Sequence, residues 1–576
     1  MSTFDARSVK QGIFLQVSRI HFGRNSDRKD NMRLLGTPKS ACVALCVILG
    51  MAIASPGQTF TSLVSFNGTD GANPGLGSLI QGTDGNFYGT TINGGIDNAG
   101  TIFKISSTGT LTTLYSFCEH LNCSDGQYPY GVLVQANDGN FYGTTYQGGG
   151  HNFGEVYKIT PSGTFTTLYS FCAQTSCTDG QSPSAGLVQG TDGNLYGTTT
   201  NTFFKMTTRG ALTTLYTFCS QANCADGSDP QGALVQSTNG AFYGTTMSGG
   251  ANSCGTVFEI TTAGKLTTLH TFNNTDGCMP AAALVLAANG NFYGTTSVGG
   301  TNNSGTLFKI TSAGVLTTLY NFCTQTNCTD GGSPHDALVQ GTDGNFYGTT
   351  AAGANDNGVV FEFTSGSRMK NLHIFSGTDG DMPYGGLLQG TDGSFYGTTL
   401  NGGTSNLGSV FNVTNGLGAF VRTTTTSGKV GAAVTILGTD LTGATAVTFG
   451  GISSTFTVVS ASEITTTVPA GAITGTVNVA LPAGTLMSNV TYRVTPQLLS
   501  FSPSSGAVGT TVTITGVSLT KTTKVTFGGV AAKTYTVNSD TQVTATVPTG
   551  AKTGKIQITT TGGTATSTTN FTVTAP

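Results

Sequence analysis

The chain has 576 residues, more than one hydrophobic core ordinarily serves, so several domains are expected. Only 9% of the residues are charged and 84 are glycine, while strand-favouring Thr, Val, Leu, Phe and Tyr are abundant. Residues 1–40 carry eight Lys or Arg, which leaves residues 41–576 with a net charge of −8 and excludes nucleic acid or an anionic membrane surface as the partner.

An apolar run of 14 residues, 41–54, follows basic residues near the amino terminus. The run is short for a membrane span, and an A-x-A cleavage pattern ends it just before Ser55. Residues 1–54 are therefore predicted to be a leader and signal peptide, and the mature protein to be secreted or at the cell surface, with no membrane insertion after cleavage. A signal of usual length would begin at Met32, so residues 1–31 are a mis-assigned start or a long leader. A non-cleaved anchor is the alternative.

A repeat fills residues 59–414. The motif FYGTT, or LYGTT in one copy, occurs seven times at spacings of 47 to 54 residues. An apolar strand and a DG or NG turn precede each copy, and a Gly-rich loop, a TIFKI-like strand and an LTTLYSF-like strand follow it. Four antiparallel strands (A to D) in about 50 residues are typical of a β-propeller blade. The motifs begin at Phe87, Phe141, Leu195, Phe242, Phe292, Phe346 and Phe395.

The seventh repeat lacks its last strand, since nothing like LTTLYSF follows Val413. The missing strand stands before the first repeat instead, at residues 61–66. We therefore predict that this strand pairs with residues 409–413 and closes a ring, because an open solenoid would have no use for the offset. The fold class is all-β: a seven-bladed β-propeller whose N-terminal strand closes the last blade, followed by two Ig-like β-sandwiches.

The pattern QGTDGNFYGTT…GG…GT.FKIT..G.LTTLYSF resembles the GloVer-type tandem repeats of exported bacterial proteins. The resemblance covers about residues 59–414. It implies an exported protein and assigns no biochemical activity.

Residues 420–576 form a different, cysteine-free repeat. VTFGG begins at Val447 and again at Val525, which predicts two small β-sandwiches at 420–494 and 495–576. They resemble IPT/TIG domains, which implies an immunoglobulin-like fold and a role as spacer or binding module. The DNA binding of some relatives is not supported, because the second unit carries only five scattered Lys or Arg.

The ten cysteines after the leader predict five disulfides in an exported chain. Eight form C-x4-C pairs, and zinc is the competing interpretation, but the spacing is wider than a zinc knuckle and no His accompanies each pair. Cys254 and Cys278 lie in two loops expected on the same face, so they are predicted to bond to each other. The C-x4-C pairs are Cys118–Cys123, Cys172–Cys177, Cys219–Cys224 and Cys323–Cys328.

No catalytic constellation emerges from the sequence, so the protein is predicted not to be an enzyme. Glu155, Glu259 and Glu362 are read as occupying the same place in strand C as Lys104 and Lys309, which indicates a solvated position rather than an acid. Five histidines fall in five different repeats, without a nucleophile-elbow or HExxH motif. A divergent carbohydrate-active propeller enzyme is the alternative function.

One carboxylate recurs in a D-G-x-x-P pattern after every D strand. An Asx-turn that leads into the next strand explains it, whereas an acidic ring binding Ca²⁺ is the alternative. One Asp per blade cannot alone supply six or seven oxygen ligands, so turns are favoured, with no cofactor. The residues are Asp70, Asp125, Asp179, Asp226, Asp276, Asp330 and Asp379.

The D-to-A and B-to-C connections of a propeller emerge on one face, which we call the loop face. Its loops vary between repeats, and variable loops on a rigid scaffold are where binding usually resides. Aromatic groups there would stack on sugar rings or a partner chain, or else pack against neighbouring loops. The predicted function is a non-enzymatic binding or adhesion protein for an extracellular glycan or protein, with the C-terminal domains as spacer. The candidate ligand residues are Tyr128, Tyr130, Tyr146, His151 and Phe153.

Overall fold

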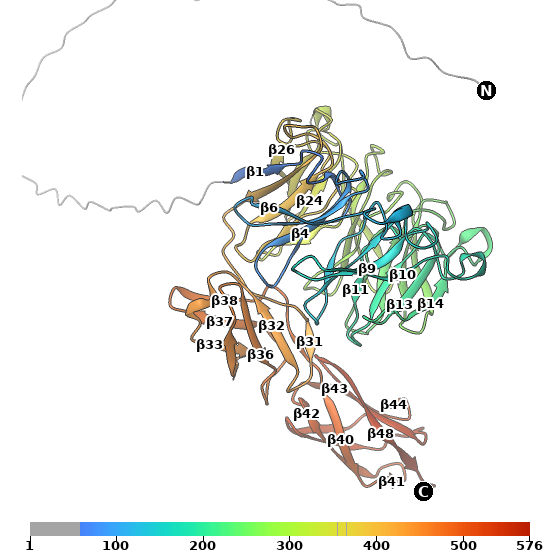
Figure 1. Ribbon diagram of the computed structural model, residues 1–576. Coiled ribbons are helices and arrows are strands. Elements are labelled where there is room, and N and C mark those ends of the chain that lie inside the picture. Colours follow the sequence, from blue (N-terminus) through green and yellow to red (C-terminus); the bar gives the residue numbers. More distant parts are fainter. Residues whose placement is uncertain (1–57, 354, 365, 576) are drawn as a thin grey trace, which may run out of the picture. The chain divides into compact units, whose positions relative to one another are not determined.

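The computed structural model describes residues 58–353, 355–364 and 366–575. It is all-β apart from short 3-10 turns (Figure 1). In the described residues no helix is long and apolar enough to cross a membrane. The predicted signal peptide and its cleavage site lie outside the described residues.

Residues 59–414 form seven antiparallel sheets, one per repeat. Glycine in the DG turn after each A strand has positive φ, as in Gly85 at 81°, which a side chain would disfavour. The strands are β1 (Thr59–Ser65), β2 (Ala72–Pro74), β3 (Ile80–Gln81), β4 (Phe87–Asn93), β5 (Thr101–Ile105), β6 (Leu111–Ser116), β7 (Val134–Gln135), β8 (Phe141–Thr145), β9 (Glu155–Ile159), β10 (Phe165–Ser170), β11 (Val188–Gln189), β12 (Leu195–Thr198), β13 (Thr202–Met206), β14 (Leu212–Thr217), β15 (Val235–Gln236), β16 (Phe242–Thr246), β17 (Thr256–Ile260), β18 (Leu266–Thr271), β19 (Val285–Leu286), β20 (Phe292–Thr296), β21 (Thr306–Ile310), β22 (Leu316–Asn321), β23 (Val339–Gln340), β24 (Phe346–Thr350), β25 (Val359–Phe363), β26 (Met369–Ile374), β27 (Leu388–Gln389), β28 (Phe395–Thr399) and β29 (Ser409–Thr414).

The predicted ring closure is confirmed by strand pairing. Strand β1 pairs antiparallel with β29, from Thr59 opposite Thr414 to Ser65 opposite Ser409. The blue β1 runs beside the golden strands of the last repeat in Figure 1. The amino-terminal strand therefore completes the seventh sheet.

The core lies between adjacent sheets, where the Phe-Tyr pair of each motif is buried. In six of the seven interfaces the Tyr ring of one motif packs against the Phe ring of the next. The series returns to its start, because the ring centroids of Tyr396 and Phe87 lie 3.9 Å apart. A glutamine at the end of strand A adds a polar link. Thr391 of the last repeat donates its backbone N–H to Gln81 Oε1 of the first at 3.1 Å. Both contacts join the last repeat to the first.

Residues 422–573 form two β-sandwiches, each with its own buried core. No sheet of the described residues joins the propeller strands to these domains, or one sandwich to the other. The first contains β30 (Arg422–Thr423), β31 (Ser427–Gly428), β32 (Ala433–Leu437), β33 (Ala446–Phe449), β34 (Ile452–Ser454), β35 (Phe456–Val458), β36 (Glu463–Thr467), β37 (Val477–Leu481), β38 (Gly484–Met487) and β39 (Arg493–Val494). The second contains β40 (Gln497–Ser502), β41 (Ser505–Gly506), β42 (Thr511–Val517), β43 (Thr522–Phe527), β44 (Val530–Ala531), β45 (Tyr535–Ser539), β46 (Gln542–Thr546), β47 (Gly554–Thr560) and β48 (Gly563–Val573).

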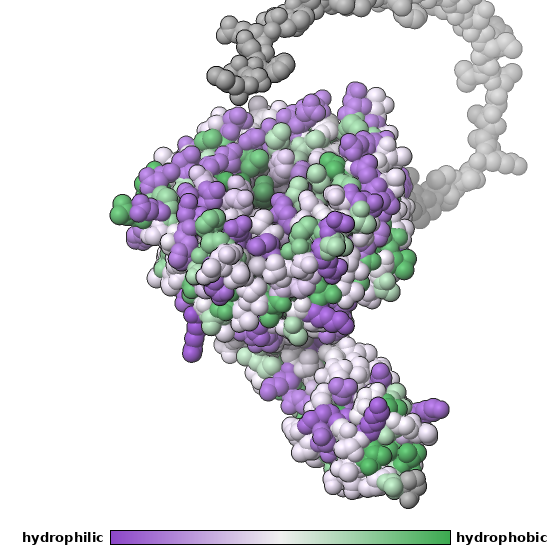
Figure 2. All heavy atoms as spheres, turned by 90° about the vertical axis from the view of Figure 1, so that its right-hand side faces the viewer, coloured by the Kyte–Doolittle hydropathy of each residue, from purple (hydrophilic) through white to green (hydrophobic). Residues whose placement is uncertain are grey.

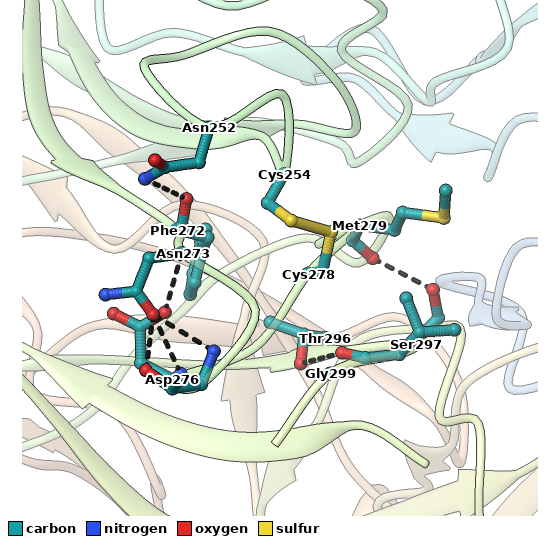
Figure 3. Close-up of a disulfide and its surroundings, with 12 residues drawn as sticks. Asn252, Cys254, Phe272, Asn273, Asp276, Cys278, Met279, Thr296, Ser297 and Gly299 are labelled. Atoms are coloured by element: carbon teal, nitrogen blue, oxygen red, sulfur yellow. Dashed lines mark hydrogen bonds between the residues drawn. A yellow bond between two sulfur atoms is a disulfide. The ribbon is translucent and has the colours of Figure 1, made fainter. Parts of the chain in front are cut away.

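The ten described cysteines are paired as the spacing predicts. Each C-x4-C loop contains a short 3-10 turn (η1, Leu121–Cys123; η2, Thr175–Cys177; η3, Ala222–Cys224; η4, Thr326–Cys328). The long bridge joins Cys254 and Cys278, whose Cα atoms are 4.5 Å apart (Figure 3). In place of a C-x4-C insertion, the loop before Cys278 is ordered by Asn273, whose Oδ1 accepts the backbone N–H of Thr275 at 3.0 Å.

We expect the mature protein to begin near Ser55 and to contain no free thiol, because all ten remaining cysteines have a partner. Intact mass measured after alkylation without reduction tests both points. The expected mass is that of residues 55–576 less ten hydrogens, with no alkyl adduct. An adduct on the folded protein would contradict the pairing.

Candidate functional site

The two connections of the loop face lie side by side in the structure. In five repeats the loop after the D strand forms a β-bridge with the segment that follows the B strand, as between Gln127 and Gln147. In the first repeat β2 takes this place and pairs with β4. The same face therefore carries the disulfide-bonded loops and the Gly-Gly loops.

The loops after the recurrent proline converge on a central cavity of about 380 Å³. All seven repeats contribute to its wall, each with residues that lie just after that proline. Glycines let these segments approach one another. A Cβ on Gly131 would lie 2.6 Å from the Ala185 carbonyl oxygen of the next repeat. The residues that contribute side-chain chemistry are Leu76, Tyr130, Ser184, Gln231, Met247, His335, Asp336 and Tyr384.

Aromatic side chains gather in one arc of this wall. The ring of His335, in the sixth repeat, lies 4.4 Å from the ring of Tyr384, in the seventh. Tyr130, in the second repeat, makes an edge-to-face contact with Tyr146 at 5.2 Å. Small side chains such as Ala281, in the fifth repeat, line the opposite arc. The cavity thus has aromatic rings on one side and non-aromatic side chains on the other.

His335 and Asp336 bring titratable groups to the wall. Burial lowers the pKa of His335 to about 4, so its imidazole is neutral at neutral pH. Burial raises the pKa of Asp336 to about 6, although its carboxylate accepts backbone N–H groups of Ala337 and Gly386, each at 2.6 Å. Each carboxylate oxygen keeps a further lone pair for a hydroxyl donor.

The five predicted ligand residues are not equivalent in the structure. Tyr130 lines the cavity and Tyr146 packs against it. Tyr128 is half-buried, and its backbone N–H bonds to Ala99. His151 and Phe153 are exposed on the loop face but do not line the cavity.

Sequence reasoning missed His335, Asp336 and Tyr384. They were detectable by aligning the residues that follow the proline in all seven repeats, since Tyr130, His335 and Tyr384 share that position. Of the other histidines, His270 and His373 stand at the Tyr position of the LTTLYSF motif. Each bonds through Nε2 to the recurrent Asp of its loop at 2.9 Å.

The recurrent aspartates cap their own turns. Asp125 accepts hydrogen bonds from the Tyr115 hydroxyl at 2.7 Å and from the backbone N–H groups of Glu119 and His120. In six of the seven repeats the carboxylate bonds to a Tyr or His of the preceding strand; Asp70 instead bonds to the backbone of Asn67. Across the described part of the chain, no group of three His, Cys, Asp or Glu is arranged to hold a metal ion.

The expected equivalence of Glu155 with Lys104 was wrong. Glu155 begins β9 opposite Thr145, whereas Lys104, Glu259 and Glu362 each lie opposite the Tyr of the motif. Strand alternation therefore directs Glu155 into the interior, and it is fully buried. Its Oε1 accepts a bond from Thr167 at 3.3 Å, while Oε2 has no hydrogen-bond partner among the described residues.

In the propeller, most of the exposed large apolar side chains lie on the loop face. The most exposed are Leu121 at 86%, in the first disulfide-bonded loop, and Ile96 at 72%, in the first B-to-C loop. Figure 2 shows apolar residues in small groups among polar ones on the visible surface.

Comparisons with known proteins found matching families and distant structural likenesses. A comparison with curated proteins found no match. Virginiamycin B lyase from Staphylococcus aureus is 16% identical, with a TM-score of 0.43 over 62% of this chain and 98% of that chain. SGBP-B from a complex xyloglucan utilization locus in Bacteroides uniformis is 26% identical, with a TM-score of 0.14 over 26% and 48%. A surface glycan-binding protein from Prevotella bryantii is 15% identical, with a TM-score of 0.21 over 27% and 38%.

The family models cover both parts of the chain. The IPT/TIG domain model matches residues 419–494 and 496–574. The Gloeobacter/Verrucomicrobia repeat model matches residues 50–202, 176–329 and 323–455, well over half of the sequence. The chain therefore belongs to the Gloeobacter/Verrucomicrobia repeat family and carries two IPT/TIG domains after its repeats.

Proposed function

We propose that the protein is an exported, non-enzymatic glycan-binding protein whose central cavity on the loop face receives the ligand. The observation that carries the proposal is the cavity of about 380 Å³ with Tyr130 and Tyr384 in its wall. The volume falls within the range of small-molecule sites, which combine mostly apolar walls with a few polar groups. The C–H face of a sugar ring can lie on the tyrosine rings. Its hydroxyls can bond to Gln231 and Asp336.

The export and spacer roles rest on other features. The predicted signal and the five disulfides suit an oxidising compartment outside the cytoplasm. The two IPT/TIG domains follow the propeller as sandwiches with separate cores. They would hold the loop face away from an attachment point.

A divergent carbohydrate-active enzyme is the second candidate, favoured by the raised pKa of Asp336. A carboxyl with a pKa of about 6 can act as a general acid near neutral pH. Glycoside hydrolysis ordinarily needs a second carboxylate, and Asp336 is the one acidic residue among those that line the cavity. This favours binding over turnover.

A polysaccharide panel tests the proposal by scoring retention in affinity electrophoresis together with release of reducing ends. We expect retention of the mature protein by at least one polysaccharide without product. Tyr384→Ala should weaken that binding about tenfold or more, or about 1.4 kcal/mol, because it removes a stacking surface. Tyr535→Ala, which changes a partly exposed aromatic residue of the last domain, is the control and should bind normally.

Three results would contradict the proposal. Release of product would establish the enzyme instead. Loss of retention in Phe153→Ala but not in Tyr384→Ala would move the ligand to the rim of the loop face. A protein partner is favoured if no polysaccharide is retained.

A further inference from the structure

A second cavity of about 350 Å³ opens on the loop face between the fifth and sixth repeats. Three loops contribute to it: residues 297–304 between β20 and β21, residues 327–333 before β23, and Ala352, Gly353 and Asp356 between β24 and β25. We call it the side groove. Its wall is mostly small or polar, with Ser304, Asn303, Asn327 and Asp356 among the lining residues.

A hydrogen bond links the wall of the side groove to the wall of the central cavity. Ser333 lines the groove, and its Oγ lies 3.2 Å from Nε2 of His335, which lines the cavity. The backbone holds Ser333 in place, because its N–H donates to the Ser304 carbonyl at 2.8 Å. The walls of the two spaces therefore adjoin at the Ser333–His335 pair.

The small side chain of Ser333 leaves room for a ligand between the side groove and the central cavity. Ser333 directly precedes the recurrent proline of its repeat. The residue at this position has a positive φ in every repeat, between 49° and 58°. Side chains larger than serine occupy five of these equivalent positions, whereas serine stands at 182 and 333. The equivalent residues are Asn73, Tyr128, Ser182, Asp229, Met279, Ser333 and Met382.

We infer that the central cavity and the side groove are adjacent subsites for one oligosaccharide, which passes over Ser333 with its terminal unit in the cavity. This inference rests on the proposed glycan-binding function. The cavity would hold the end of the chain against Tyr384 and His335. The groove would hold the next units through the side-chain amides and hydroxyls of Asn327, Asn303 and Ser304, which suit hydroxyl-rich rings.

A chain-length series tests the inference by calorimetry with cello-, xylo- and manno-oligosaccharides of one to six units. For the ladder that binds, we expect affinity to rise about tenfold or more from one unit to three and then to level off, since the groove adds a limited number of contacts. Ser333→Tyr should remove that gain, so that the affinity for three units becomes no greater than the affinity of the same variant for one unit. Tyr128 shows that the same backbone conformation accepts tyrosine.

Two further variants make the result specific. Ser182→Tyr makes the same replacement between the second and third repeats and should leave the length dependence intact. Asn327→Ala changes an exposed side chain of the groove and should reduce the gain with length in part, even if Ser333→Tyr lowers stability.

Other outcomes would overturn the inference in distinguishable ways. Equal affinity for all lengths, unchanged in Ser333→Tyr, would leave a single-unit site in the cavity and keep the proposed function. Equal loss in Ser182→Tyr and Ser333→Tyr would place the longer chain elsewhere. Absence of binding to every ladder and to the polysaccharide panel would reject the proposed function together with the inference.

Discussion

Deleting residues 58–67 is expected to lower the melting temperature of the propeller by on the order of 10 °C. The deletion removes β1, which supplies the outer strand of the seventh sheet. It also removes Phe66, which is fully buried, and Phe60, whose ring stacks on His373 at 3.5 Å. Losing one buried Phe costs about 3–5 kcal/mol, and the exposed edge of β29 adds to that loss.

The experiment compares thermal unfolding of chains that begin at Gln58 and at Gly68, each measured by circular dichroism. Phe66→Ala in the longer chain should reproduce part of the loss, because it removes packing against Phe103 and leaves the strand in place. Identical melting curves for the two chains would contradict ring closure by β1.

Raising the pH from 6.5 to 8.5 is expected to lower the free energy of unfolding by about 2 kcal/mol through Glu155 alone. Burial raises the pKa of this carboxyl to about 8, and the charge of Asp125 adds to the shift. Between pH 4.5 and pH 8 the folded state therefore holds a proton that the unfolded state has lost. Stability falls as pH rises through this range and levels off above pH 8.

The pH window separates Glu155 from the cavity groups. Asp336, with a pKa raised to about 6, and His335, with a pKa lowered to about 4, complete most of their stability change below pH 6.5. Denaturant unfolding of Glu155→Gln should show a flat profile from pH 6.5 to 8.5. Glu155→Thr, which restores the residue of the first repeat, Thr101, is the second variant. A slope that persists in both variants would assign the pH dependence to another group.

The fold was largely predictable because repetition makes strand position readable. The offset of residues 61–66 indicated that β1 would complete the last sheet, and the pairing of β1 with β29 agrees. The Cys254–Cys278 pair followed from two loops that leave the same face. Both inferences needed only the order of strands around a ring.

The central cavity was harder to predict, because its wall collects one or two residues from each repeat. Tyr130 and Tyr384 lie far apart in the chain and line one cavity only because the ring brings the second and seventh repeats to a common centre.

The position of Glu155 was predicted wrongly for a different reason. In the strand EVYKI, the residue equivalent to Glu259 is Lys158, three positions after Glu155. Because side chains alternate along a strand, a shift of three positions places Glu155 on the opposite face of the sheet.

The most direct test of glycan binding in the central cavity is a crystal structure of the mature protein with the longest oligosaccharide that binds. We predict a terminal sugar ring within the cavity, against Tyr384 and near Tyr130, with Asp336 and Gln231 within hydrogen-bond distance of its hydroxyls. A sugar bound on the IPT/TIG domains or elsewhere on the propeller, with the central cavity unoccupied, would contradict the account.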